Sequence, residues 1–179
     1  MRKILGFFLG MAFLLCLPAA AQESSKADAF LGYSYVRANP ATSGAPSFNL
    51  NGGSGSVAYY PFRSLGIVAD FGGYHASNIG TVYTYLFGPR LAHHIGRVTP
   101  FAQVLFGGAH DGSGAISSPA SANAFAMTAG GGLDVNLSQH LGIRLVQGEY
   151  LMTRFQEVVG ASRTRQNNAR ISTGIVFRW

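Results

Sequence analysis

The chain has 179 residues, a formal net charge of +6 at pH 7 and a pI near 9.8. Charged residues make up 11% of it and hydrophobic residues 47%, whereas an ordinary soluble domain carries about a quarter charged residues. The basic residues are scattered, without the basic helix or the Lys/Arg run interleaved with aromatics that nucleic-acid binding requires. We therefore expect no nucleic-acid partner.

The same composition favours a membrane β-barrel over a helical membrane protein. Beyond residue 21 the sequence has no stretch of about 18 apolar residues, the length that predicts a spanning helix. In a barrel only every second residue faces lipid. Few charges, 24 Gly and many aromatics therefore occur together without a long apolar run.

Residues 1–21 are predicted to form a secretory (Sec) signal peptide. Arg2 and Lys3 form a positive region before the apolar run Ile4–Leu17, and small residues precede the expected cleavage site after residue 21. Loss of these two basic residues lowers the charge from +6 to +4. Cleavage would also remove Cys16, so we expect no disulfide and no thiolate metal site. We expect no other metal site and no cofactor.

Residues 22–28 are predicted to be a short lead and residues 29–179 a single barrel domain. Within this domain, segments of alternating hydrophobicity are separated by Gly-, Pro-, Ser- or Asn-rich turns. The predicted strands are Phe30–Arg37, Asn49–Tyr60, Leu65–Tyr74, Thr81–Leu91, Pro100–Ala109, Ala124–Leu137, Leu141–Thr153 and Asn168–Trp179.

Tight turns alternate with connections that are mostly longer, and the long ones are 38–48, 113–123 and 154–167. This pattern predicts an all-β fold, an eight-stranded antiparallel up-and-down transmembrane β-barrel with both termini on the short-turn, periplasmic side. An even strand count closes the sheet and removes its edges, which lipid would not tolerate. An interior of this size is filled by side chains, so we expect a plugged lumen.

The final strand has a mostly apolar face that carries Ile175, Phe177 and Trp179, while Arg178 lies on the opposite face. An aromatic ring at the end of a barrel strand fits the lipid–water interface. These three side chains are therefore predicted to be interface residues. An aromatic final strand of this kind also resembles the assembly signal that the barrel-assembly machinery reads.

Residues 129–145 read Ala-Gly-Gly-Gly-Leu-Asp-Val-Asn-Leu-Ser-Gln-His-Leu-Gly-Ile-Arg-Leu. This Gly-rich strand, acid, tight turn and inward Arg resemble the OmpA-type (OmpA/OmpX-like) eight-stranded outer-membrane barrels, over about residues 29–179. The resemblance implies a monomeric, non-enzymatic protein of a Gram-negative-type outer membrane that supports the envelope or presents outer loops for interaction. It also implies contacts with outer-membrane lipid, lipopolysaccharide, periplasmic chaperones and the barrel-assembly machinery.

Side chains alternate between the two faces of a strand, and we call the face on which a residue falls its parity. By this parity four charged residues face inward: Asp70, Arg90, Asp134 and Arg144. The resemblance implies ion pairs between Asp70 and Arg144 and between Asp134 and Arg90, since an unpaired charge in a narrow lumen is costly. Two functions remain open for these pairs. They are either a structural plug or the gate of a narrow, porin-like channel.

Strict alternation from Arg144 sends Gln147 and Glu149 toward lipid and Tyr150 inward. Either a bulge near Val146–Gly148 reverses this parity, or Glu149 lies near the headgroup level, where the cost is smaller. The sequence leaves both alternatives open.

Other candidate sites are weaker. His75-Ala76-Ser77-Asn78 has the local form of the His-x-Ser pair of PagL-type lipid A deacylases, with Glu149 or Glu157 as the only late carboxylates. It lies earlier in the chain than that family's site and lacks any supporting motif, so we do not expect an enzyme. A soluble periplasmic barrel that binds an apolar ligand is a further alternative.

The neighbours His93 and His94 point to opposite faces of a strand and are not expected to share a metal ion. The pair His110-Asp111 is likewise expected to be interfacial. Basic residues near the last strand are predicted to lie on the outer side, where they would meet lipopolysaccharide or a partner; they are Arg163, Arg165 and Arg170.

Overall fold

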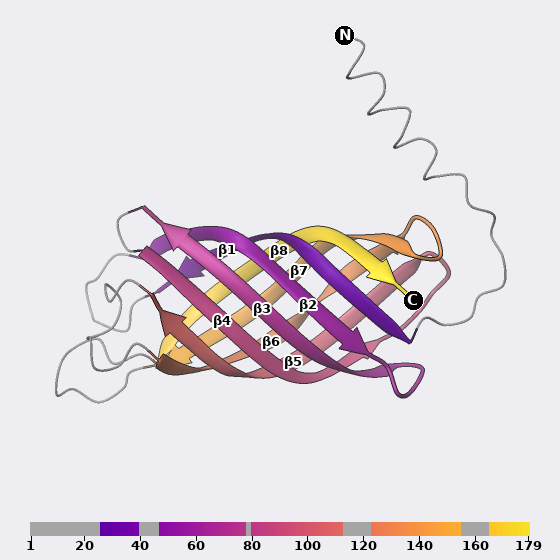
Figure 1. Cartoon of the computed structure of the whole chain (residues 1–179), viewed down its shortest axis with the longest axis horizontal. Coiled ribbons are helices and arrows are strands. Elements are labelled where there is room, and N and C mark those ends of the chain that lie inside the picture. Colours follow the sequence, from indigo (N-terminus) through magenta and orange to yellow (C-terminus); the bar gives the residue numbers. More distant parts are fainter. Residues whose placement is uncertain (1–25, 40–46, 78–79, 113–122, 155–164) are drawn as a thin grey trace, which may run out of the picture.

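The computed structural model describes residues 26–39, 47–77, 80–112, 123–154 and 165–179. Within these ranges eight antiparallel strands form one closed barrel, in which each strand pairs with the next and β8 pairs with β1 (Figure 1). The predicted fold class is therefore confirmed. The strands are β1 (Ala27–Ala38), β2 (Phe48–Tyr59), β3 (Leu65–Ala76), β4 (Gly80–Ala92), β5 (Val98–Asp111), β6 (Asn123–Asn136), β7 (Leu141–Arg154) and β8 (Gln166–Arg178).

The first strand begins earlier than predicted. β1 starts at Ala27, so Ala27 and Asp28 belong to the barrel and not to the predicted lead of residues 22–28. The reason is pairing, because Asp28 lies opposite Ala58 of β2 and Arg178 of β8. The predicted signal peptide, residues 1–21, lies outside the described residues.

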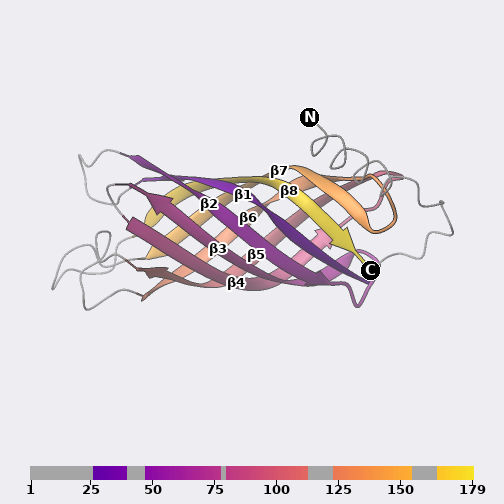
Figure 2. The same cartoon turned by 45° about the horizontal axis from the view of Figure 1, so that its top comes forward.

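The two ends of the barrel differ. The short connections 60–64, 93–97 and 137–140 lie at the end where β1 begins and β8 finishes, which we call the terminal end. There the N–H of Ala27 donates to the carbonyl of Trp179 at 3.0 Å, and the N–H of Trp179 donates to the carbonyl of Ala27 at 3.1 Å. The strands β1, β3, β5 and β7 finish at the opposite end, which we call the loop end and which Figure 2 shows from a second direction.

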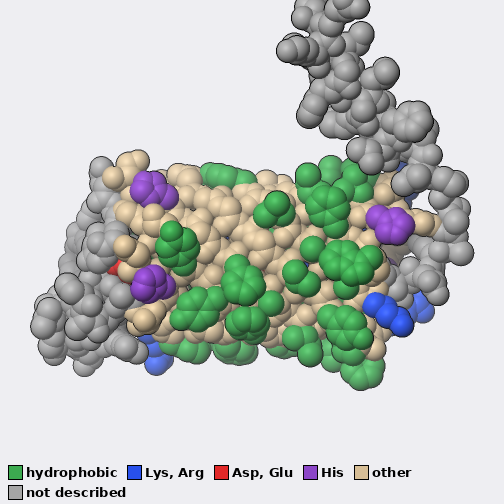
Figure 3. Space-filling view, viewed as in Figure 1, with side chains coloured by type: hydrophobic (Ala, Val, Ile, Leu, Met, Phe, Trp, Pro, Cys, Tyr) green, Lys and Arg blue, Asp and Glu red, His purple; other side chains and the backbone are tan. Residues whose placement is uncertain are grey.

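Strand alternation sorts the side chains into two sets. In β1, Leu31 and Tyr33 are 68% and 52% exposed on the outer wall, whereas Phe30 and Ser34 are buried inside. Figure 3 shows the hydrophobic side chains spread over the middle of the wall, with most of the Lys, Arg and His side chains near its two ends. We call the exposed apolar side chains of this wall the belt; they include Leu31, Ile67, Phe71, Phe87, Phe106, Ile171 and Ile175.

The irregular part of β7 is a bulge. The pairing with both neighbours shifts register here, and Leu145 and Val146 are both exposed on the outer wall. The extra residue restores the parity, so Gln147 and Glu149 are buried in the lumen while Tyr150 faces outward. Of the two alternatives that the sequence left open, the bulge is the one observed.

Candidate functional site in the barrel lumen

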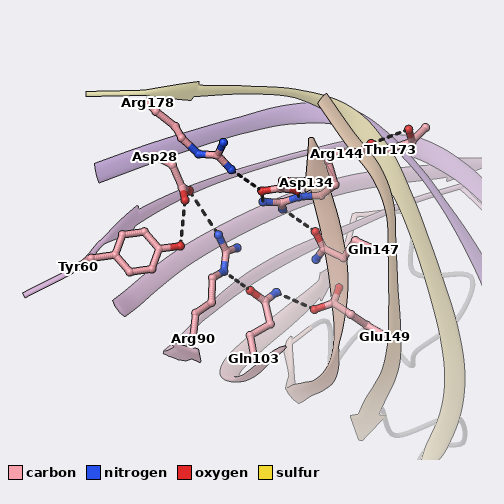
Figure 4. A network of polar contacts seen from close by, with 10 residues as sticks. All are labelled: Asp28, Tyr60, Arg90, Gln103, Asp134, Arg144, Gln147, Glu149, Thr173 and Arg178. Atoms are coloured by element: carbon pink, nitrogen blue, oxygen red, sulfur yellow. Dashed lines mark hydrogen bonds and ion pairs between the residues drawn. The ribbon is translucent and has the colours of Figure 1, made fainter. Parts of the chain in front are cut away.

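The four charged residues predicted to face the lumen do so. Asp70, Arg90, Asp134 and Arg144 are each at most 2% exposed. They belong to a larger network that also contains Asp28, Glu149, Arg170 and Arg178. Four guanidinium groups therefore face four carboxylates, and the network as a whole is electrically balanced (Figure 4 shows most of it).

The predicted partners within this network are wrong. Arg144 pairs with Asp134, at 2.8 Å from its Nε, because the bulged register of β6 and β7 places these two residues directly opposite each other. Asp70 instead pairs with Nη1 of Arg170 at 2.7 Å. Arg90 pairs with Asp28, which the sequence analysis had placed outside the barrel, at 3.3 Å.

One chain of contacts begins at the terminal end. Asp28 accepts a hydrogen bond from the hydroxyl of Tyr60 at 2.9 Å and one from Nη1 of Arg90 at 3.3 Å. Arg90 in turn donates from Nε to the amide oxygen of Gln103 at 2.8 Å. These residues come from β1, the turn after β2, β4 and β5, so the chain of contacts spans the interior.

The same series of hydrogen bonds continues toward the loop end. Gln103 donates to Glu149 at 2.7 Å, and Glu149 accepts from Nε of Arg170 at 2.6 Å. Arg170 also donates from Nη1 to Asp70 at 2.7 Å and to the hydroxyl of Tyr74 at 3.0 Å. A single guanidinium thus joins β3, β7 and β8.

Arg144 is held by rings as well as by charge. Its guanidinium carbon lies 4.3 Å from the ring centre of Phe30 and 4.4 Å from that of Phe101, which is cation–π geometry. Nε and Nη2 donate to the two oxygens of Asp134 at 2.8 and 3.1 Å, and Nη1 donates to Gln147 at 2.6 Å. The planar, forked arginine side chain suits this combination of stacking and two-point pairing.

Beyond Tyr74 the lumen changes character, because apolar side chains such as Val36, Leu50 and Leu151 pack there beside uncharged polar ones; the polar ones are Thr84, Thr153, Gln166 and Asn168. The pocket among them is small, about 30 Å³, so it has room for very few water molecules. Ion pairs thus dominate the half of the lumen at the terminal end, whereas uncharged side chains fill most of the half at the loop end.

Two titratable groups at the terminal end have shifted pKa values. Burial raises the pKa of Tyr60, in the turn after β2, to about 12; Asp28 adds to this shift and Arg90 opposes it. Partial burial lowers the pKa of His94, and the positive charges of Arg178 and Arg63 lower it further. Both shifts favour the uncharged side chain.

No family model matches the chain, and no curated protein matches it. Among solved structures, Neisserial surface protein A (NspA) superposes with a TM-score of 0.61 at 14% identity, covering 87% of this chain and 98% of that one. The chain has the fold of the small outer-membrane β-barrels. Ail, the attachment invasion locus protein of Yersinia pestis, superposes with a TM-score of 0.56 at 15% identity, covering 87% of this chain and 99% of that one.

A barrel from the de novo design of transmembrane β-barrels is about as similar. Its TM-score is 0.53 at 12% identity, over 89% of this chain and all of the designed one. At identities this low the likeness concerns the fold, and a fold alone does not carry a function.

The His-x-Ser pair does not form a catalytic triad with Glu149. His75 lies exposed on the outer wall, where its Nδ1 is 3.1 Å from Oγ1 of Thr81, whereas Glu149 is buried in the lumen and bound to Arg170. Glu157 lies outside the described residues. In the described part of the chain, no three His, Cys, Asp or Glu side chains gather as a metal site, and no helix is long and apolar enough to cross a membrane.

The predicted outer basic group is corrected in part. Arg170 is 1% exposed and lies in the lumen, because it has the same parity as Ser172 and Arg178. Arg165 is exposed at the loop end, and Arg163 lies outside the described residues.

The sequence analysis missed one lumen residue that alternation could have found. Asp28 lies on the same, inner face of β1 as Phe30.

Three residues predicted for the membrane interface lie on the outer wall at the terminal end. Ile175, Phe177 and Trp179 are 47%, 48% and 60% exposed. This position is compatible with an interfacial role, which remains a prediction.

Proposed function

We propose that the protein is a monomeric, non-enzymatic β-barrel of a Gram-negative-type outer membrane, which supports the envelope and presents its loop end for interaction. The observation that carries this proposal is an outer wall on which every strand exposes large apolar side chains, around an interior in which four buried Arg side chains pair with four carboxylates. Export by a signal peptide and delivery by periplasmic chaperones and the barrel-assembly machinery are parts of the same proposal.

The belt supports insertion into lipid. A soluble protein rarely exposes a contiguous apolar surface larger than a few hundred Å², whereas here every strand carries large exposed apolar side chains. Every Asp and Glu side chain in the described ranges is buried, so none of them faces the surface that lipid would cover. A soluble barrel built to hold an apolar ligand would need the reverse arrangement.

The packing of the interior favours a structural plug rather than the gate of a channel. A gate needs a path that opens when one contact breaks, but here a second packed segment, which contains Leu50 and Leu151, lies in series with the ionic one. Breaking Asp134–Arg144 therefore leaves this second segment in place.

The loop end supports contact with anionic molecules. Arg37, Arg154 and Arg165 are exposed there, at the level where lipopolysaccharide phosphates would lie in an outer membrane. Adhesion is a finer form of this proposal. One similar barrel, Ail of Yersinia pestis, is named for attachment and is known in complex with a heparin analogue.

The test is depth-dependent substitution of the belt. Phe71 lies in the middle of β3 and Leu65 at its terminal end, and both side chains face outward. A basic side chain at the bilayer midplane costs about 2–4 kcal/mol and close to nothing near the interface. The folded barrel is recognised on a gel because boiling shifts its migration. We therefore expect Phe71→Arg to reduce this heat-shifted species strongly in the outer-membrane fraction, and Leu65→Arg to leave it almost unchanged.

Equal behaviour of the two variants, or wild-type protein in the soluble fraction without a heat shift, would overturn membrane insertion. Lipid A mass spectrometry on expressing cells separately tests the non-enzymatic part. Loss of acyl chains that depends on His75 would contradict it.

A further inference from the structure

The charged side chains on the outer surface of the described residues are all of one sign. All of its Asp and Glu side chains are buried, while exposed Lys and Arg side chains remain at both ends of the barrel. Those at the terminal end cannot be paired with an acidic side chain of the described surface. They are Lys26, Arg63 and Arg97.

These three residues come from three separate points of the rim. Lys26 precedes β1, Arg63 lies in the turn between β2 and β3, and Arg97 lies in the turn between β4 and β5. We call Lys26, Arg63 and Arg97 the terminal ring.

Each turn of this rim also exposes a large apolar side chain. Phe62 is 67% exposed beside Arg63, Ile95 is 59% exposed near Arg97, and Leu137 is 45% exposed in the turn that carries His140. The C-terminal Trp179, 60% exposed, lies at the same end. A cation beside an apolar side chain is the arrangement that binds the interface of an anionic membrane.

The turns are too compact to project far from the barrel. The N–H of Ile95 donates to the carbonyl of Val98 at 2.8 Å, and the reverse bond is 3.0 Å. In the next turn the N–H of Leu141 donates to Oγ of Ser138 at 3.1 Å. The basic side chains therefore stay close to the level at which the belt ends.

We propose that the terminal ring binds the phosphates of anionic phospholipids in the adjoining leaflet, with Phe62, Ile95 and Trp179 inserted among the upper acyl segments. This inference rests on the proposed membrane location. The apolar member of each turn is what favours a lipid surface over an acidic cell-wall polymer. Such a polymer would engage the cations but would leave these apolar side chains in water.

The pKa of His94 agrees with this arrangement. Partial burial is the main reason why it is lowered, and the positive charges of Arg178 and Arg63 lower it further.

The experiment uses Trp179, the only tryptophan of the sequence. The mature chain is folded into phosphatidylcholine vesicles that contain a fixed fraction of either brominated phosphatidylglycerol or brominated phosphatidylcholine, and quenching of Trp179 fluorescence is compared. Since Trp179 lies at the terminal end, its quenching reports the lipid composition there and not at the loop end. Each basic residue near an anionic surface contributes about 1 kcal/mol, or about a fivefold preference.

We expect stronger quenching by the brominated phosphatidylglycerol, and loss of this preference in the triple variant Lys26→Gln/Arg63→Gln/Arg97→Gln. The matched control, Arg37→Gln/Arg154→Gln/Arg165→Gln, removes the same charge from the loop end and should keep the preference. High salt should weaken the preference in the wild type.

Equal quenching by the two lipids in the wild type, or a preference that survives the terminal triple variant, would overturn this inference while leaving membrane insertion intact. Cosedimentation with purified peptidoglycan that depends on the terminal triple, without a lipid preference, would assign the ring to the cell wall instead. Absence of quenching by either lipid would contradict the proposed function itself.

Discussion

At the scale of single residues, Arg144 shows how a charge is made stable inside this barrel. Its side chain is fully buried between the rings of Phe30 and Phe101 and binds both oxygens of Asp134. Burying an ion costs several kcal/mol, and only good pairing geometry recovers that cost. Removing one partner is therefore worse than removing both.

We expect Arg144→Ala to lower the free energy of unfolding by about 3–5 kcal/mol, because Asp134 keeps only Arg178 as its partner. Arg144→Lys should recover little of this loss, since lysine has no planar fork for the rings and the carboxylate. The double variant Arg144→Met/Asp134→Asn should recover most of it. Urea unfolding in detergent micelles measures all three, with the exposed Arg37→Gln as the control. A double variant no more stable than Arg144→Ala would contradict this account.

At the scale of elements, the seam between β1 and β8 closes the barrel and depends on two glycines. Gly32 lies directly opposite Gly174. A Cβ on Gly174 would lie 2.3 Å from the carbonyl oxygen of Leu31 and 2.4 Å from the Cα of Gly32. Backbone atoms occupy these positions, so no side-chain rotation relieves the clash.

We expect Gly174→Ala to destabilise the folded barrel by about 1–3 kcal/mol through overpacking. Gly148→Ala is the matched control, because a Cβ there meets no atom within 4 Å. Samples are heated to increasing temperatures before electrophoresis. The temperature at which the folded species disappears from the gel distinguishes the two variants. Equal midpoints would show that the seam relaxes freely.

The bulge in β7 is the second element-scale feature with a measurable consequence. Deleting Val146 should turn Gln147 and Glu149 toward the outer wall and separate Glu149 from Arg170. We expect this deletion to abolish the folded species. The control Val146→Ala, at a side chain 47% exposed, should preserve it. A deletion variant that folds normally would mean that the parity of β7 is not fixed by the bulge.

At the scale of the whole molecule, two layers of buried side chains lie in series along the lumen. The ionic layer occupies the half at the terminal end, and side chains such as Leu50 and Leu151 occupy the half at the loop end. Ions cross apolar constrictions poorly because they cannot keep their hydration there. Opening either layer alone is therefore insufficient for conduction.

We expect no steady conductance from the wild type in planar bilayers, and none from Arg144→Ala. Combining Arg144→Ala with Leu50→Ser and Leu151→Ser should produce measurable current, because both layers are then interrupted. The variant with only the two serines is the control and should stay closed. A steady, ion-selective current from the wild type would instead support the gated channel.

Much of the architecture followed from alternation along the strands. Parity placed Leu31 outside and Asp70 inside, and the turn pattern fixed the strand order. Partners across the lumen did not follow, because pairing depends on height along the barrel axis, which one extra residue in β7 changes. Asp28 was missed because its strand was taken to begin later, although its parity with Phe30 was visible.

The contact between Asp70 and Arg170 has a further consequence for assembly. These residues are 100 positions apart in the sequence, and Arg170 lies on the last strand to be made. Asp70 cannot meet this partner until β8 reaches its place, and the same strand then docks against β1. The stabilisation from this ion pair therefore arrives late on the route to the closed state. Contacts of this kind mainly slow unfolding and change the rate of folding little. A finished barrel should consequently be long-lived even where its equilibrium stability is modest.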